Sequence, residues 1–359
     1  MLKKIAATAI LFTAYFNAAI AQDSTKTLVF SGGLDAYYRY NFSDKYANNY
    51  TSFTNSQSSF ELGMATVRAD ATALSGKVAA TLDLGFGRRA EEFSYNDGPS
   101  YVSGKNGYIS LSNVKQLFVS YAPSSKVKFT FGKFGTHVGY ELVDAQLNRN
   151  YSMSYMFTNG PFFHTGLKAD ITAGPVGLMV GVANYTDQAT ATNNVKSVLA
   201  QLSGGTSNGK IKAYLNFVGS YGSNTLSIPG GLKSLSQYDL VVTGTVSSKF
   251  GVGFNATVQN RKTDIASGSW WGAAGYFNFD PTAAVGLTLR SEYIGDNKMV
   301  YFGTKSIFAN TLSLNYKVGP LTIVPELRYE TAERNYYAKK DGSGSKSTFS
   351  SLLAVMYKF

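Results

Sequence analysis

The sequence predicts an all-β protein: a transmembrane antiparallel β-barrel of about sixteen strands with short periplasmic turns and long extracellular loops, preceded by a cleaved signal peptide. Apolar and polar side chains alternate along almost every segment, which indicates strands with one apolar face. Short turns alternate with long polar connections, a pattern typical of outer-membrane barrels. The 36 Gly, 25 Tyr and 24 Phe, against 8 Pro, fit many amphipathic strands joined by turns.

The chain begins with a predicted signal peptide, residues 1–21. Lys3 and Lys4 precede an apolar run, which ends in an Ala19-x-Ala21 pattern before Gln22. The alternative, a first transmembrane helix, is disfavoured because the run is short and ends in a cleavage-like site. We expect cleavage near Ala21 and a single barrel domain over residues 22–359.

Composition excludes several classes of function. The net charge of +11 is spread along the chain without a basic block, so a nucleic-acid partner is not expected. The absence of cysteine excludes disulfides, thiol catalysis and thiolate metal sites. Export without disulfides suits a bacterial envelope protein, and we expect the cell outer membrane of a Gram-negative bacterium.

The period-two pattern starts in the first segment, "TLVFSGGLDAYYRYNF", where Leu34 and Ala36 share one face and Asp35 and Arg39 share the other. It recurs near residues 78–86, 211–217, 250–259 and 321–330, with charges opposite the apolar face. Near Arg68 the alternation changes phase, which predicts a bulge. A soluble sandwich also alternates, but one of this length and strand number would be unusual.

Aromatic residues cluster near segment ends. Rings such as those of Tyr37, Tyr38, Trp270 and Trp271 are predicted to form girdles at the headgroup level. The last segment, "SSLLAVMYKF", keeps an apolar face to its final residue. Tyr357 and Phe359 are therefore predicted to form a terminal signal that the barrel-assembly machinery reads before closing the last strand against the first.

The interval from Gly132 to Ala169 departs from the hairpin rhythm and contains both histidines. We expect residues 135–160 to fold into the lumen and narrow it. A metal or hydrolase site is disfavoured because no H-E-x-x-H spacing or G-x-S-x-G turn is present, so no catalytic residue, metal or cofactor is predicted. The histidines are expected to join the loop to the wall. The candidate constriction residues are His137, Glu141, Asp144, Asn148, Arg149, Tyr151 and His164.

This interval resembles a known family. Its runs Gly132-Lys133-Phe134-Gly135-Thr136, Gly139-Tyr140-Glu141, Asn148-Arg149-Asn150-Tyr151-Ser152, and His164-Thr165-Gly166 after Pro161, are similar to those of the β-barrel porin family described as OmpL-like. Such porins occur in Gram-negative outer membranes, notably those of Bacteroidota-like bacteria. The resemblance implies a general diffusion pore but no particular solute.

Charged residues on the predicted lumen face form a mixed set. Opposed basic and acidic walls would screen solutes by charge, which with the positive balance predicts a weak preference for anions. The alternative is cross-strand pairing that serves stability alone. The candidates are Arg39, Arg68, Lys168, Arg261, Arg290, Arg328, Asp35, Asp83, Glu292 and Glu326.

Two functions follow from this sequence: an outer-membrane porin for passive diffusion of small hydrophilic solutes and ions, or a barrel with a closed lumen that acts as an adhesin or structural anchor. An enzyme and a plugged transporter are both disfavoured. Outer-membrane lipid is an expected partner, and a homotrimer is left open. Small residues at predicted inward positions favour the open lumen; they are Gly63, Ala65, Gly85, Gly87, Gly181, Gly272 and Ala274.

Overall fold

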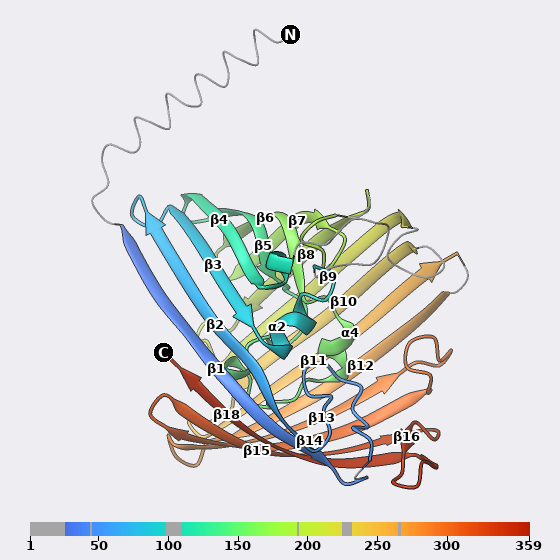
Figure 1. Cartoon of the computed structure of the whole chain (residues 1–359). Coiled ribbons are helices and arrows are strands. Elements are labelled where there is room, and N and C mark those ends of the chain that lie inside the picture. Colours follow the sequence, from blue (N-terminus) through green and yellow to red (C-terminus); the bar gives the residue numbers. More distant parts are fainter. Residues whose placement is uncertain (1–25, 44, 98–108, 192–193, 225–231, 265–266) are drawn as a thin grey trace.

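The computed structural model describes residues 26–359 except 44, 98–108, 192–193, 225–231 and 265–266. The predicted signal peptide lies outside the described residues. Sixteen strands close into one antiparallel barrel, each paired with its neighbours in the chain (Figure 1). The predicted fold class and strand number are confirmed.

The barrel wall consists of strands β1 to β15 and β18. Their bounds are β1 Thr27–Asn41, β2 Ser59–Ala73, β3 Val78–Phe86, β4 Val114–Ser124, β5 Val127–Gly135, β6 Phe163–Ala173, β7 Val176–Asn184, β8 Lys196–Gly205, β9 Ile211–Asn224, β10 Leu232–Thr245, β11 Phe250–Thr263, β12 Ser267–Phe279, β13 Val285–Gly295, β14 Ser306–Val318, β15 Leu321–Ala332 and β18 Ser347–Lys358.

Short elements lie between the wall strands. Strands β16 and β17 form a separate two-stranded sheet in the loop between β15 and β18. Figure 1 shows the helices α2 and α4 within the ring of strands. The bounds of the short elements are α2 Arg88–Phe93, α3 Ile109–Ser112, η1 Ala145–Leu147, α4 Tyr155–Asn159, β16 Tyr337–Ala338 and β17 Gly344–Ser345. Among the described residues, no helix combines the length and apolar character needed to cross a membrane.

The first and last strands close the barrel. β1 pairs with β18 from Gly33 opposite Lys358 to Asn41 opposite Ser350. Gly32 and Phe359 extend this ladder by exchanging two backbone hydrogen bonds of 3.1 Å each. Closure gives every wall strand a partner on both sides, as a lipid environment requires.

The connections differ between the two ends of the barrel. Tight turns join the strands at the end of the barrel where β1 begins and β18 ends. In four of these turns a glycine supplies a positive φ: Gly76 at 83°, Gly174 at 62°, Gly209 at 67° and Gly319 at 57°. At the other end the connections include residues 42–58, 87–113 and 136–162. Short turns face the periplasm in this class of barrel, so the long loops lie at the extracellular end.

Alternation along the strands sets the two faces of the wall. Leu34, Leu82 and Leu327 are exposed on the outer face, whereas Asp35 and Asp83 are buried on the inner face. The predicted phase change is a register shift between β1 and β2, at which Gly63 and Met64 together face Asp35. The bulge lies a few residues before the predicted position near Arg68.

The girdle prediction was wrong for Tyr37 and Trp270. Both side chains point into the barrel, with exposed fractions of 3% and 0%. Their neighbours Tyr38 and Trp271 lie on the outer face. The physical reason is the pleat itself, because adjacent residues of a strand point to opposite faces and a pair of rings cannot both meet lipid.

We expect deletion of Phe359 to lower the amount of folded protein in the outer membrane, because this residue completes the β1–β18 ladder and exposes its ring on the outer face. Phe359→Ala retains the backbone bonds and isolates the role of the ring. Phe349→Ala, on the same face of β18 but far from the terminus, is the matched control. The measurement is the heat-modifiable band in outer-membrane fractions, and normal yield of both Phe359 variants would refute the prediction.

Candidate functional site

Residues 136–162, which join β5 to β6, lie inside the barrel and are called the lumen loop here. The loop includes η1 and α4, and it is hydrogen-bonded to inner-face residues of several strands. It was predicted at 135–160, but Gly135 is the last residue of β5. His164 lies in β6 rather than in the loop, because the strand begins at Phe163.

Three buried carboxylates bind the backbone of the lumen loop. Glu326 on β15 accepts the N–H groups of Tyr151 at 2.8 Å and Ser152 at 3.2 Å. Glu292 on β13 accepts the N–H of Tyr155 at 2.9 Å. Glu141, within the loop, accepts the N–H of Ser154 at 2.8 Å. These bonds satisfy backbone donors that have no strand partner.

Two buried arginines form ion pairs with Glu141 and Glu292 and bind the carbonyls of the loop. Arg290 forms an ion pair with Glu141 and donates to the Ser152 carbonyl at 2.7 Å. Arg328 donates to the Met153 carbonyl at 2.7 Å and to Glu330 at 2.8 Å. Both guanidinium groups are almost fully buried. The loop is therefore fastened by charge-assisted bonds that involve β13 and β15.

Small residues of the inner wall make room for the lumen loop. A Cβ on Gly63 would overlap Asp35 and lie 2.7 Å from the Tyr151 hydroxyl. A Cβ on Gly272 would lie 2.7 Å from Met156 Cγ. Gly63 and Gly272 therefore make room for the loop and are not evidence for an open lumen. The inward assignment of Ala65 was wrong, since Ala65 lies on the outer face.

The predicted loop residues occupy different places. His137 Nε2 lies 3.1 Å from the Phe217 carbonyl of β9, and His164 Nε2 lies 3.0 Å from Thr136 Oγ1. These contacts have the form expected for histidines that join loop to wall. Asp144 accepts from Lys115 Nζ at 2.6 Å, Asn148 bonds within the loop to Leu142, and Arg149 binds Asp280 at 2.5 Å.

Most predicted lumen charges have partners of opposite sign or hydrogen-bond partners. Arg68 pairs with Asp70 at 2.6 Å and Lys168 pairs with Asp170 at 3.2 Å. Asp83, Asp35 and Arg39 are also inward and bonded: Asp83 to Lys115 at 3.2 Å, Asp35 to the Tyr151 hydroxyl at 2.5 Å, and Arg39 to the carbonyls of Ala47 and Ser56. Arg261 differs, because it makes no ion pair within the part of the chain that the structure describes.

Arg89 of α2 was not among the residues predicted from the sequence. Its guanidinium is fully buried, donates to the carbonyls of Val143 at 3.2 Å and Tyr151 at 3.1 Å, and lies over the rings of Phe53 and Tyr151. The available signal was the spacing of Arg88 and Glu92, which pair at i, i+4 on this helix. No sequence signal placed the helix inside the barrel.

Two polar cavities lie along β9, β10 and β11. The outer cavity, of about 220 Å³, is lined by Tyr95, Thr158, Asn159, Gly160, Pro161, Tyr185, Thr186, Asp187, Val218, Leu235, Gln237, Gln259, Arg261 and Tyr301. The inner cavity, of about 360 Å³, is lined by Tyr140, Arg149, Gly209, Lys210, Lys212, Thr243, Gly244, Thr245, Ser247, Ser248, Lys249, Phe250, Gly251, Val252, Asn278 and Asp280.

The lumen loop lies across the inner face of the wall between these two cavities. Asp239 on β10 accepts the Gly139 N–H at 3.0 Å and the side-chain amides of Asn216 at 2.8 Å and Asn255 at 2.6 Å. The next loop residue, Tyr140, stacks on Tyr276 with ring centroids 4.0 Å apart. The crossing, defined by Gly139, Tyr140 and Asp239, thus separates an extracellular cavity from a periplasmic one.

Asp187, which lines the outer cavity, has a raised pKa. Burial raises the pKa of Asp187 to about 6, and hydrogen bonds from the backbone N–H groups of Phe163 and Phe162 oppose that rise. The same carboxylate accepts the Tyr95 hydroxyl at 3.1 Å. Both carboxylate oxygens of Asp187 therefore accept hydrogen bonds, one from the Phe162 N–H and the other from the Tyr95 hydroxyl. Within the described residues, no three His, Asp or Glu side chains form a group that could hold a metal ion.

The closed barrel with an inserted loop defines this protein as a channel-type outer-membrane barrel. The sequence matches the family described as "Putative beta-barrel porin-2, OmpL-like" over residues 27–359. The chain therefore belongs to this porin family, as the resemblance predicted, and its place is the outer membrane. A comparison with curated proteins gave no match.

Solved structures share the fold at low sequence identity. The outer-membrane channel DcaP of Acinetobacter baumannii is 12% identical with a TM-score of 0.63, covering 94% of this chain and 98% of that one. The anion-selective porin from Comamonas acidovorans is 10% identical with a TM-score of 0.62, covering 93% and 100%. The trimer form of OmpT from Vibrio cholerae is 15% identical with a TM-score of 0.57, covering 94% and 100%.

We expect Arg290→Leu to destabilise the folded barrel by about 3–5 kcal/mol, because it leaves Glu141 buried without its cation and removes one of the two cations beside Glu292. Arg149→Leu is the matched control: it removes an ion pair between the loop and the wall that is one-third exposed, and should change stability by about 0–1 kcal/mol. The measurement is the denaturant midpoint of the heat-modifiable form. Equal midpoints for the two variants would show that burial of the network does not decide its strength.

Proposed function

We propose that this porin conducts small hydrophilic solutes and ions along the β9–β11 side of its lumen, with a weak preference for anions. The observation that carries the proposal is the placement, on both cavities of that side, of cationic side chains that have no acidic partner among the described residues. The porin class follows from the family; the path and the selectivity are the proposal.

The lumen loop fills the barrel unevenly. On the side of β13 and β15, buried bonds from Glu292, Arg290 and Arg328 hold the loop against the wall. On the side of β9 to β11, polar cavities of about 220 and 360 Å³ flank the crossing. We therefore place the solute path along β9 to β11, with the crossing at Gly139 and Tyr140 between its two cavities.

Basic side chains on the two cavities are the basis of the proposed anion preference. The inner cavity contains Lys210, Lys212 and Lys249, and its acidic residue Asp280 is paired with Arg149. The outer cavity contains Arg261, while the oxygens of Asp187 accept loop donors. Unpaired cations along a narrow aqueous path raise the local concentration of anions.

The crossing also supports a second candidate function. The wall side chains Asn216, Asp239 and Asn255 are almost fully buried beneath it, and Tyr140 stacks on Tyr276. A lumen closed at this height suits an adhesin or structural anchor. Conduction requires the crossing to move away from Asp239, so channel recordings distinguish the two functions.

The remaining partners are part of the same proposal. A homotrimer is supported by the trimer form of OmpT, whose fold is similar, although the identity is 15%. Outer-membrane lipid would cover the exposed apolar face of the wall, and the barrel-assembly machinery would insert it. Passive diffusion makes and breaks no bond, so no catalytic residue is assigned.

Single-channel recordings under a salt gradient test the charge argument. We expect stepwise conductance with a reversal potential on the anion side. Combined K210Q, K212Q and K249Q changes should lower the anion-to-cation permeability ratio by about twofold or more. Combined K77Q, K126Q and K317Q changes remove equal charge from exposed positions near the turn end that do not line the inner cavity, and should have less effect. Equal shifts, or a cation-side potential in the parent protein, would overturn the proposed selectivity.

A second recording tests the crossing. Asp239→Ala removes the acceptor of the Gly139 N–H, a charge-assisted bond worth about 1.5–3 kcal/mol, so the open fraction should rise by about tenfold or more. Asp239→Asn keeps a side-chain oxygen for Gly139 and is the conservative control. Silence from the parent and both variants, all folded by heat-modifiability, would favour the anchor.

A further inference from the structure

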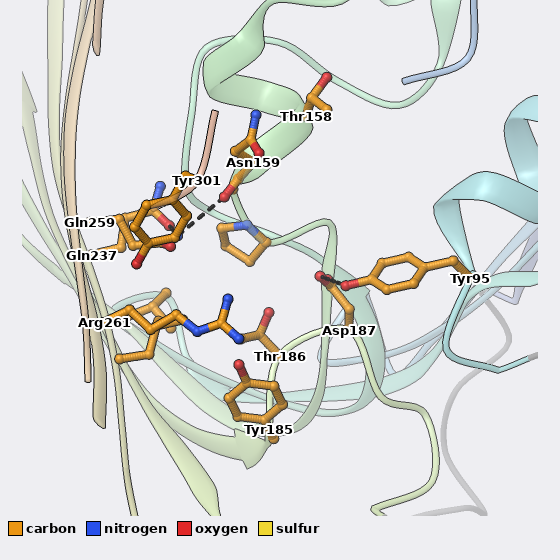
Figure 2. A pocket seen from close by; sticks show the side chains of 14 residues that line it. Tyr95, Thr158, Asn159, Tyr185, Thr186, Asp187, Gln237, Gln259, Arg261 and Tyr301 are labelled. Carbon is orange, nitrogen blue, oxygen red and sulfur yellow. Dashed lines mark hydrogen bonds between the residues drawn. The ribbon is translucent and has the colours of Figure 1, made fainter. Parts of the chain in front are cut away.

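The outer cavity combines groups that recognise solutes. Figure 2 shows Arg261 extending from β11 toward Thr186 and Tyr185, with Tyr301 and the amides of Gln237 and Gln259 beside it. These residues come from the wall, from the loop that follows β7 and from the loop before β14. Wall and loops therefore converge on one guanidinium at the extracellular end.

Arg261 has unused hydrogen-bonding capacity. Its Nε is buried and has no hydrogen-bond partner among the described residues, and the same holds for the Tyr301 hydroxyl on the same cavity. Buried donors in native proteins are nearly always paired, so two orphaned groups on one cavity indicate a ligand oxygen. A guanidinium offers that oxygen a fork of donors, which matches a carboxylate.

The acidic residue nearest in the lining does not neutralise Arg261. Asp187 accepts the N–H groups of Phe162 at 2.6 Å and Phe163 at 3.1 Å, together with the Tyr95 hydroxyl. Figure 2 shows its carboxylate turned toward Tyr95. Asp187 therefore binds backbone N–H groups where the lumen loop meets β6, and it forms no ion pair with Arg261.

The rest of the lining favours a small organic molecule. Tyr95, Tyr185 and Tyr301 supply aromatic surface with polar edges. Gln259 donates to the Asn159 carbonyl at 3.1 Å and to Gln237 Oε1 at 2.9 Å, so the amides are held in place before any solute arrives. The volume of about 220 Å³ lies below the range of about 300–1,000 Å³ typical of drug-sized ligands.

We infer that the outer cavity is a binding site for a small monocarboxylate with a flat body, anchored by Arg261 and flanked by Tyr185 and Tyr301. Among the described residues that line the cavity, Arg261 is the sole cation, which favours one negative charge over a multiply charged phosphate. The inference deepens the proposed function, on which it depends for a solute path past the site. Binding itself requires access from the extracellular end alone.

Calorimetric titration of benzoate into the detergent-solubilised barrel tests the site. Benzamide, which has the same shape without the charge, should bind at least about tenfold more weakly. Arg261→Gln should weaken benzoate binding by at least about tenfold, and Arg261→Lys should weaken it less. Lys262→Gln is the matched control, because it removes the same charge from the opposite face of the same strand and should leave binding unchanged.

Heat-modifiability of each variant establishes that it is folded. Equal benzoate affinity in the parent and a folded Arg261→Gln variant would refute the site, and so would equal affinity of the parent for benzoate and benzamide. Benzoate binding that Lys262→Gln weakens as strongly would show a general charge effect and would likewise refute it.

Bilayer recordings separate failure of the site from failure of the channel. Benzoate added on the loop side should interrupt the current of the parent but not of Arg261→Gln. Conductance without Arg261-dependent interruption would leave the porin and remove the site. Arg261-dependent binding to a barrel that never conducts would keep the site and remove the proposed path.

Discussion

The lumen loop depends on one constraint: its backbone groups must find partners inside a barrel wall that has already used its own backbone in strand ladders. Side chains of the wall meet this requirement. Glu292 and Glu326 accept loop N–H groups, and Arg290 and Arg328 donate to loop carbonyls. Both arginines also form ion pairs with Glu292, which offsets the cost of burying these charges. The distribution of charge on β13 and β15 thus follows from the need to hold an irregular segment in place.

The same constraint explains why the lumen is asymmetric. Where carboxylates and guanidinium groups are dense, the loop is fixed and the space is filled. Beneath the crossing, β9 to β11 instead present neutral amides and hydroxyls, such as Asn216, Asn255 and Thr257. The loop is held on this side by Asp239, by the His137 contact to β9 and by Gln259 of β11. The crossing at Gly139 and Tyr140 thus lies between two cavities, and fewer charge-assisted bonds hold it than hold the loop on the side of β13 and β15.

The sequence predicted the wall well because the pleat imposes a period that can be seen in any single strand. It identified the sixteen strands, the phase change and the inward position of Asp35 or Arg290. It failed where the partner is distant in the chain. The ion pair of Arg290 with Glu141 joins residues 149 positions apart, and nothing near Gly63 indicates that Tyr151 will occupy the space beside it. Likewise, aromatic clustering placed Trp270 toward lipid because the loop that covers it on the inner face was not known.

The contrast between Arg290 and Arg261 shows how position converts the same chemistry into different roles. Both are inward arginines, on β13 and β11. Arg290 lies where the loop places Glu141 and two carbonyls beside it, so its guanidinium holds the loop in place. Arg261 lies above the crossing, where the carboxylate in the neighbouring loop is already engaged by backbone N–H groups. Among the described residues Arg261 forms no ion pair, so in the proposed site its guanidinium is the group that a carboxylate solute would contact.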